Sequence, residues 1–364
     1  MRILYLITST TVGGAERTLA RLVRGLDRKR AEPAGVVCLK PLGPVAGEIE
    51  SCGVPVRSIG MGYLPSPFDL AKLRGAIDSF RPDIVHAFLY RAIQFARLAK
   101  GDWKLVSSPR VNYRTRPMPL RLIDRLGRNR DDLTICEAQS TADFMEAELG
   151  YDPSRLRVIH NGINPVAASP EEVTSVRSSL GFGRGDFIIL SAGRLSEQKG
   201  FPFLIEAMPG VLGKYPSVRL VIAGEGPDRP ALESLIARLG LSDKVRLVGE
   251  QGNLSPWYMA ANAFALPSLW EGLPNCLLEA MSAGLPCVAT AVDGTLEICQ
   301  SGAEALLVPP GSSDGLARAL SELCSNSVLR ETLSSNGRRN VEANFTMSRM
   351  LAQYEQAYEE VLVR

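Results

Sequence analysis

The chain has 364 residues, of which 45% are apolar and 22% are charged, and its formal net charge is +2. Its 33 glycines and 24 prolines are too few for a collagen-like or disordered chain. No apolar run approaches the roughly 20 residues that span a membrane, so the composition is typical of a soluble globular protein with two or three domains.

Charge is distributed unevenly along the chain. Residues 1–165 hold 25 Lys and Arg against 17 Asp and Glu, whereas residues 166–364 hold 16 against 22. The first part is therefore basic and the second acidic, which indicates different partners for the two parts.

The first part alternates short β-branched segments with segments of helical periodicity. We expect strands at residues 3–7, 35–39, 84–87, 104–107 and 133–138, and helices at residues 16–26, 70–79 and 141–149. The opening segment is interpreted as a buried strand rather than a signal peptide, because polar Thr8 to Thr11 and a glycine pair follow it at once. A cytoplasmic protein is the resulting expectation.

The same alternation returns in the second part. We expect strands at residues 187–192, 219–223, 245–247, 263–266, 287–290 and 305–308, and helices at residues 203–212, 230–239, 277–283, 313–323 and 349–363. Between the parts, residues 158–170 are rich in Gly, Asn, Pro and Ser, which is typical of a linker.

Strands that alternate with helices predict an α/β protein with two Rossmann-like lobes, each a parallel sheet wrapped by helices. We expect an N-terminal lobe at residues 1–165 and a second lobe at residues 166–347, with a final helix at about 348–364 packing back on the first lobe. Ligands of such sheets bind at the carboxyl ends of the strands, which in two lobes indicates a cleft between them.

Metal binding and disulfide bonds are not expected. The seven cysteines are odd in number and none forms a C-x-x-C pair, so we interpret them as buried free thiols in a reducing compartment. Asp131 and Asp132 are the only paired acids of the right kind, and a solvated turn explains them better than a metal site.

Two short segments follow predicted strands and carry groups suited to an anion. Gly13 and Gly14 open a helix after the first strand, which fits a tight turn as well as an anion or sugar site. Arg194 and Lys199 follow the strand at 187–192, where two cations suit a diphosphate. Taken alone, they could equally be two solvated surface cations.

A third segment places two carboxylates, Glu271 and Glu279, around a Gly-Leu-Pro-Asn loop. Asn275 is expected to cap the following helix and Gly284 to end it, with Glu279 in the first turn. Free amides at residues 276–278 would then face the same site. Complementing the helix dipole accounts for Glu279 but not for Glu271.

Together these segments resemble the retaining glycosyltransferases of family four, which have the GT-B fold. The resemblance is strongest in SAGRLSEQKG (191–200), IAGEGPD (222–228) and LPSLWEGLPNCLLEAMSAGLPCVATAVDG (266–294), and weaker in GGAE (13–16), PDIVH (82–86) and NGI (161–163). It runs over nearly the full length of the chain.

The resemblance implies a role for each matching residue. Arg194 and Lys199 correspond to the pair on the donor diphosphate, Glu279 to the acid on the ribose, and Glu271 to the acid at the transferred sugar. The implied donor-binding set is Gly14, Arg194, Lys199, Glu225, Gly272, Leu273, Pro274, Asn275, Leu277, Leu278 and Glu279. His86 is a catalytic candidate beside Glu271, although Phe88 stands where the family often has a second His; a structural role for His86 is the alternative.

The implied reaction is transfer of a sugar from a nucleotide diphosphate donor, with a uridine nucleotide expected, to a hydroxyl of a lipid-linked or cell-surface glycan. The resemblance implies retention through same-face displacement, with no cofactor beyond the nucleotide sugar. The alternatives are a GT-B nucleotide-sugar epimerase, which needs no acceptor, a non-catalytic sugar-binding protein, and a pyridoxal-dependent phosphorylase.

An anionic membrane surface is a further expected partner. Arg17, Arg21, Arg24 and Arg28 share one face of the first predicted helix, whose Leu19, Leu22, Val23 and Leu26 remain for the core. Residues 110–130 add seven Arg, and a helix from Pro119 would place Arg121, Arg125 and Arg128 on one face and Leu122, Ile123 and Leu126 on another. A solvated basic face is the alternative, and nucleic-acid binding is not expected, because few aromatic residues are interleaved.

Overall fold

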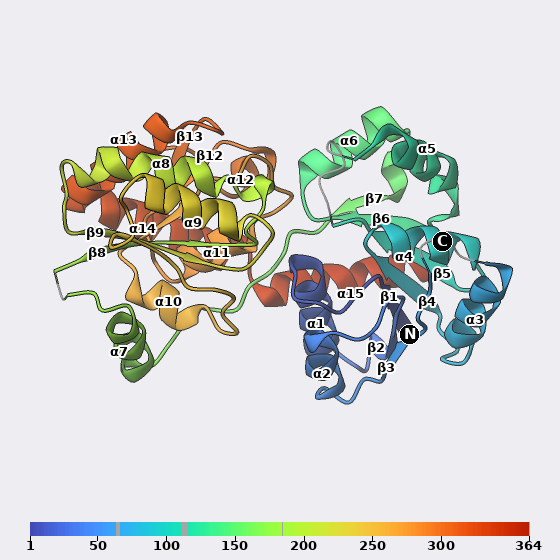
Figure 1. Ribbon diagram of the computed structural model, residues 1–364. Helices are drawn as coiled ribbons and strands as arrows, with labels where there is room; N and C mark the ends of the chain where they lie inside the picture. Colours follow the sequence, from blue (N-terminus) through green and yellow to red (C-terminus); the bar gives the residue numbers. More distant parts are fainter. Residues whose placement is uncertain (63–65, 111–115, 184, 364) are drawn as a thin grey trace. The chain divides into compact units, whose positions relative to one another are not determined.

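The computed structural model describes residues 1–62, 66–110, 116–183 and 185–363. The chain forms two compact units (Figure 1): Met1–Gly162 with Met347–Arg364, and Ile163–Thr346. The sequence had placed the boundary at residue 165. It falls earlier because the Ile163 amide donates to the Phe345 carbonyl at 2.9 Å and thereby joins the second unit.

The first unit contains a seven-stranded, wholly parallel sheet in the order β3-β2-β1-β4-β5-β6-β7. Its strands are β1 (Arg2–Ile7), β2 (Glu32–Cys38), β3 (Val56–Ser58), β4 (Ile84–Phe88), β5 (Lys104–Ser108), β6 (Leu133–Cys136) and β7 (Leu156–Val158). Its α-helices are α1 (Gly14–Gly25), α2 (Pro44–Glu50), α3 (Pro67–Asp78), α4 (Tyr90–Leu98), α5 (Met118–Gly127), α6 (Gln139–Leu149) and α15 (Met347–Val363).

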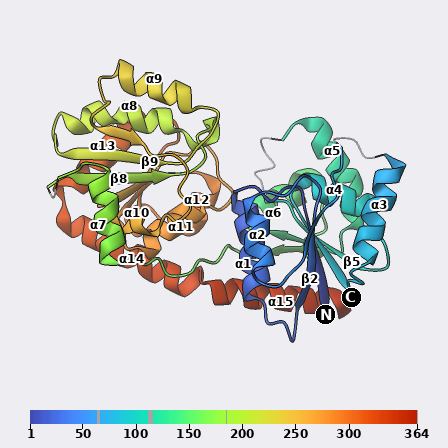
Figure 2. The same ribbon diagram turned by 60° about the horizontal axis from the view of Figure 1, so that its bottom comes forward.

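Both faces of this sheet are covered, as the continuous apolar run of β1 predicts. Ile3, Tyr5 and Ile7 belong to a cluster with α1, α2 and α15, whereas Leu4 and Leu6 belong to a cluster with α3 and α4. Figure 2 shows α15 running along the sheet beside α1. The C-terminal helix therefore completes the core of the N-terminal unit.

The second unit contains a six-stranded parallel sheet in the order β10-β9-β8-β11-β12-β13. Its strands are β8 (Phe187–Ala192), β9 (Val218–Ala223), β10 (Val245–Leu247), β11 (Ala263–Leu266), β12 (Cys287–Thr290) and β13 (Leu306–Val308). Its α-helices are α7 (Pro170–Ser179), α8 (Phe201–Leu212), α9 (Arg229–Arg238), α10 (Ser255–Ala260), α11 (Asn275–Ser282), α12 (Asp293–Ile298), α13 (Ser313–Ser325) and α14 (Ser327–Asn344).

Two apolar clusters sandwich this sheet as well. Ile189 packs with α8, α9 and α13, whereas Ile188 and Leu190 on the other face pack with α10 and α11. All eleven predicted strands are present, and the α/β class with two parallel sheets is confirmed. The elements that sequence analysis missed include the three-residue edge strands β3 and β7 and the largely polar helix α14.

Candidate functional site

The carboxyl ends of β8, β9 and β11 lie next to one another in the second sheet. From β8 the chain builds outward through β9 and β10 on one side, then returns to β11 on the other, so the strand order reverses between β8 and β11. Such a switch point is where open parallel sheets bind ligands. The segments that follow these three strands carry Arg194 and Lys199, Glu225, and Glu271 respectively.

Lys199 and Glu271 form an ion pair at the centre of this edge. The Lys199 ammonium lies 2.5 Å from Oε1 of Glu271, and the Ser268 hydroxyl donates to the same oxygen at 2.6 Å. Gln198 donates to Oε2 of Glu271 at 3.4 Å. Only 6% of the Glu271 side chain and 15% of the Lys199 side chain are exposed. The carboxylate is thus fixed by three side chains, of which sequence analysis had identified only Lys199.

The electrostatics follow from this burial. Desolvation is the largest single influence and acts to lower the pKa of Lys199, but the opposing influences of the surrounding groups, of which the Glu271 charge is the largest, together outweigh it, so the pKa of Lys199 is raised above its usual range. Burial raises the pKa of the neighbouring Cys276 thiol to about 12. The site therefore holds a persistent ammonium and a neutral thiol, which suits charge stabilisation and not thiolate chemistry.

Glu279 lies on α11 and is also positioned by a residue that sequence analysis missed. The hydroxyl of Tyr258, on α10, donates to Oε2 of Glu279 at 3.1 Å, and Tyr258 is almost fully buried. Burial, followed by the charge of Glu279, raises the pKa of that phenol well above its usual range. Tyr258 therefore acts as a permanent hydrogen-bond donor to the carboxylate.

The start of α11 differs from the sequence expectation. The N-cap is Pro274, so Asn275 is the first helical residue and Glu279 the fifth, one residue deeper than predicted. The amides of Leu277 and Leu278 were expected to be free, but both donate to the Pro274 carbonyl, at 3.1 and 3.4 Å. Proline has no side-chain oxygen, so no side chain at the N-cap accepts from the first amides of α11.

The loops at this edge pack backbone against backbone. Gly294, at the start of α12, lies so close to the Gly272 carbonyl that any side chain at residue 294 would collide with it. Leu273 and Pro274, which follow Gly272, are both buried. The loop that carries Glu271 is therefore closely packed against the start of α12.

Two predicted residues lie on the exposed side of this edge. Arg194 is exposed, and its guanidinium has no hydrogen-bond or ion-pair partner among the residues that the structure describes. Glu225 is also exposed and forms an ion pair with Arg229 one turn along. Arg194 is thus a cation available to a ligand, whereas Glu225 is already paired.

In the first unit, Gly14 begins α1 directly after the extended residue Gly13. A side chain at Gly14 would meet no atom within 4 Å, so its backbone faces open space. Glu16 is buried beside it and accepts a hydrogen bond from Ser9 at 3.1 Å. Burial raises the pKa of Glu16. This geometry leaves room for a ligand at Gly14.

His86 does not lie at the end of its strand. It occupies the middle of β4, is fully buried, and has both ring nitrogens engaged: Nδ1 with the Tyr358 hydroxyl at 2.7 Å and Nε2 with the Ser108 hydroxyl at 2.8 Å. Burial, reinforced by Arg110, lowers its pKa well below the usual value. These contacts favour the structural role, which was the alternative to His86 as a catalytic residue.

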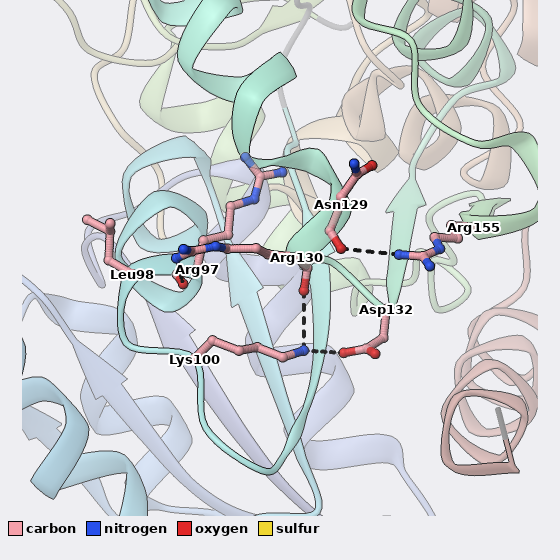
Figure 3. A pocket seen from close by; sticks show the side chains of 7 residues that line it. All are labelled: Arg97, Leu98, Lys100, Asn129, Arg130, Asp132 and Arg155. Atoms are coloured by element: carbon pink, nitrogen blue, oxygen red, sulfur yellow. Dashed lines mark hydrogen bonds and ion pairs between the residues drawn. The ribbon is translucent and has the colours of Figure 1, made fainter.

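Other hollows in the surface lie apart from these residues. Figure 3 shows an open hollow of about 550 Å³ lined by Lys100, Arg130 and Arg155, which precede strands β5, β6 and β7 and so lie at the amino edge of the first sheet. Its cations are engaged with backbone carbonyls or with Asp132. Within the described ranges, the structure contains no group of three potential metal-ligating side chains. None of the described helices combines the length and apolar character needed to cross a bilayer.

Comparison with protein families assigns both parts of the chain. Residues 12–166 match Glycosyltransferase Family 4, and residues 173–340 match Glycosyl transferases group 1. The two matches cover most of both units, and β1 and α15 of the first unit lie outside them. They agree with the resemblance inferred from the motifs around Arg194 and Glu271.

Named relatives extend this similarity. The chain is 28% identical over 338 residues to the lipopolysaccharide core biosynthesis glycosyltransferase LpsE of Rhizobium meliloti, covering 92% of each chain. It is 29% identical to a D-inositol 3-phosphate glycosyltransferase of Streptomyces bingchenggensis, covering 77% of this chain and 64% of that one. Among solved structures, Anabaena Alr3699/HepE in complex with UDP-glucose superposes with a TM-score of 0.87 at 23% identity, covering 99% of this chain and 100% of that one.

Proposed function

Because the chain is a glycosyltransferase of family four with the two-lobed GT-B fold, we propose that it moves a sugar from a uridine-diphosphate donor to a hydroxyl with retained anomeric configuration. The observation that carries this proposal is the Lys199–Glu271 ion pair at the switch point of the second sheet, with exposed Arg194 beside it. A solved structure of similar fold, Alr3699/HepE, was obtained with UDP-glucose.

In this proposal the second unit binds the donor. Arg194 and Lys199 neutralise the diphosphate, because guanidinium and ammonium groups bind phosphate oxygens strongly. Glu279, oriented by Tyr258, accepts from the ribose hydroxyls, and Glu271 accepts from the transferred sugar. Gly14, at the open start of α1 in the first unit, is a further candidate for donor binding.

The proposed chemistry is a same-face displacement. The bond from the anomeric carbon to the diphosphate oxygen breaks, the acceptor oxygen bonds to that carbon, and the departing diphosphate takes the acceptor proton. Glu271 is a poor nucleophile because both of its oxygens already accept hydrogen bonds. Catalysis then depends on positioning and on charge stabilisation by the two cations, with no resident cofactor.

We infer that the acceptor is a lipid-linked or cell-surface glycan. Two observations support this: the similarity to LpsE, whose name assigns it to lipopolysaccharide core biosynthesis, and the basic composition of residues 1–165. A protein with such an acceptor would work at the inner face of the cell membrane, bound peripherally.

A panel of nucleotide sugars tests the donor by thermal shift. At 100 times its Kd, the true donor should stabilise the protein by about 2.7 kcal/mol. Proton NMR of the product, formed with a glycolipid acceptor, then reports the anomeric configuration. If the enzyme epimerises the donor when no acceptor is present, it is an epimerase and not a transferase. A product with inverted anomeric configuration would contradict the proposal of retention.

A further inference from the structure

Helix α5 in the first unit exposes apolar side chains and buries a charged one. Four of its apolar residues are exposed, with fractional exposures of 74% for Met118, 56% for Leu122, 48% for Ile123 and 76% for Leu126, whereas Asp124 is its single buried residue. Spacings of four residues place Met118, Leu122 and Leu126 along one stripe. In α1, by contrast, the leucines face the core as usual.

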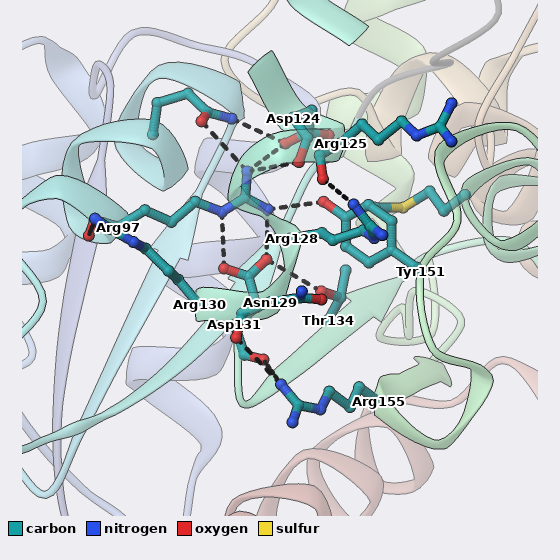
Figure 4. A network of polar contacts seen from close by, with 12 residues as sticks. Arg97, Asp124, Arg125, Arg128, Asn129, Arg130, Asp131, Thr134, Tyr151 and Arg155 are labelled. Carbon is teal, nitrogen blue, oxygen red and sulfur yellow. Dashed lines mark hydrogen bonds and ion pairs between the residues drawn. The ribbon is translucent and has the colours of Figure 1, made fainter. Parts of the chain in front are cut away.

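A buried polar network holds α5 in this orientation (Figure 4). Asp124 accepts from the Arg97 guanidinium at 2.5 Å and from Gln94 at 2.8 Å. Arg97 also binds both carboxylate oxygens of Asp131, at 2.8 and 2.6 Å, and the Tyr151 hydroxyl at 2.7 Å. Turning the leucines inward would break these buried ion pairs, which is strongly unfavourable. The apolar exposure is therefore built into the fold.

Arginines flank this apolar stripe. Arg125 is exposed on α5, and Arg121, Arg128 and Arg130 each donate to a backbone carbonyl of the first unit while keeping their charge. The exposed acidic side chains nearby, Asp143, Glu146 and Glu148, belong to the adjacent helix α6. Two copies of this chain meeting α5 to α5 would bring the arginines of both helices together, which disfavours a symmetric dimer.

We propose that the stripe formed by Met118, Leu122, Ile123 and Leu126 inserts into the headgroup region of an anionic lipid membrane. A short helix with exposed leucines flanked by arginines has the chemistry of an interfacial membrane anchor, because the apolar side chains enter the acyl boundary while guanidinium groups reach the lipid phosphates. This proposal rests on the membrane-side function above and names the surface responsible for it.

This contact differs from attraction by charge alone. Arg21 of α1 donates to the Gly162 carbonyl and Arg28 to the Cys52 carbonyl, so part of the basic face of α1 is engaged within the unit. Apolar insertion is not screened by salt, whereas exposed charge attraction is. Binding through α5 should therefore persist in part at about 1 M salt.

Vesicle flotation of the full chain tests this, with phosphatidylcholine alone compared with a mixture containing phosphatidylglycerol. The variant Leu122→Ser/Leu126→Ser should weaken binding by about tenfold or more and abolish the salt-resistant part, because buried leucines supply it. Arg125→Gln should weaken binding only at low salt. Val328→Ser is the matched control, since Val328 is 71% exposed in the second unit.

Two results would overturn the proposal: no flotation with either lipid, or flotation unchanged in the double serine variant. A concentration-dependent dimer in light scattering, lost in that variant, would instead assign the stripe to a second copy of this chain. Donor-induced thermal shift is measured on every variant. If the shift persists while flotation fails, the membrane contact is wrong and the transferase function stands.

Discussion

The two sheets hold their polar groups in opposite ways. In the second unit, Lys199 and Glu271 lie on loops beyond the carboxyl ends of the strands and pair with each other. In the first unit, His86 lies within its strand and is covered by Tyr358 of α15. The edge of the second sheet is thus organised for a charged ligand, whereas the first sheet uses its histidine to attach a helix.

The hydrogen-bond partners of Glu271 and of His86 also differ in their distance along the chain. The groups around Glu271 come from two loops of one sheet, those after β8 and β11, so charge already lies where a diphosphate would sit, and little reorganisation is needed on binding. The partner of His86 is 272 residues away in sequence. The first unit therefore depends on a distant segment for its core, and its histidine is committed to that core.

The largest effect is expected at the ion pair. Lys199→Met should destabilise the protein by about 3 kcal/mol, because Glu271 would be left as a buried, unpaired charge, and should also weaken binding of uridine diphosphate. The double variant Lys199→Met/Glu271→Gln should regain much of the stability but not the affinity. Thermal unfolding and calorimetric titration measure the two quantities separately.

The control for this experiment is Lys214→Met, which removes an exposed ammonium from the same unit. Glu271→Gln alone should leave affinity for uridine diphosphate nearly intact and reduce turnover, since it frees Lys199 and loses a contact to the transferred sugar. If the double variant is no more stable than Lys199→Met, the pair is not coupled as its geometry indicates.

The second prediction concerns the exposed cation of the same edge. Arg194→Ala should lose about 1.5–3 kcal/mol of donor binding, the contribution of hydrogen bonds to charged groups. Its melting temperature should not change, because its guanidinium has no partner in the described part of the chain. Arg238→Ala, at another exposed arginine, should leave both quantities unchanged. Unchanged affinity in Arg194→Ala would remove this residue from the donor site.

Sequence analysis predicted this half of the molecule better than the other. The strands that precede Arg194 and Glu271 have clear apolar patterns, and glycines mark the loops that follow them, so local signals were sufficient. It missed Tyr258 and Ser268, which touch the predicted carboxylates. No local pattern distinguishes Tyr258 from an ordinary core residue, because its contact forms only when α10 packs beside Glu279 of α11. Ser268 lies three residues before Glu271 in the same loop, and its contact depends on the conformation of that loop, which the residue pattern does not define.

Tyr258 supplies the third prediction, at that missed position. Tyr258→Phe keeps the ring in the core but removes the donor to Glu279, so donor affinity should fall by about tenfold, or roughly 1.5 kcal/mol. Stability should fall by less, because Glu279 is half-buried and water can replace the hydroxyl. Titration with uridine diphosphate measures the affinity. An unaffected affinity would show that Glu279 does not need to be oriented.

In the first unit, sequence analysis was limited by contacts across the chain. The strand pattern located β4, but nothing near His86 in sequence indicates that Tyr358 covers it. Helix α5 is a second example. Sequence analysis predicted its apolar and basic faces, but which face is buried depends on the contact between Arg97 and Asp124. Periodicity defines the faces of a helix, and only tertiary contacts decide which face is buried.

The smallest effect on turnover is expected at His86. His86→Gln should leave turnover within about twofold of the wild-type value, because the buried ring has no open path to a substrate. A glutamine can still bond Ser108 or Tyr358, so the fold should be retained at a moderate cost. Loss of turnover of 100-fold or more in a variant that remains folded would show that His86 acts in catalysis after all.

The pH dependence of stability separates the two roles of His86 further. Its folded pKa is depressed by burial and by Arg110, so below about pH 6.5 the unfolded chain binds a proton that the folded chain does not. The contribution of His86 to the free energy of unfolding is therefore fully present above that pH. It falls by up to about 1.4 kcal/mol per pH unit on acidification. The difference in unfolding free energy between wild type and His86→Gln should shrink steadily from pH 7 to pH 5. A constant difference would mean that the folded and unfolded chains take up the proton equally, so that burial does not lower the pKa of His86. A difference that grows on acidification would mean that the imidazole is protonated in the folded protein, which would break its contrast with the charged edge of the second unit.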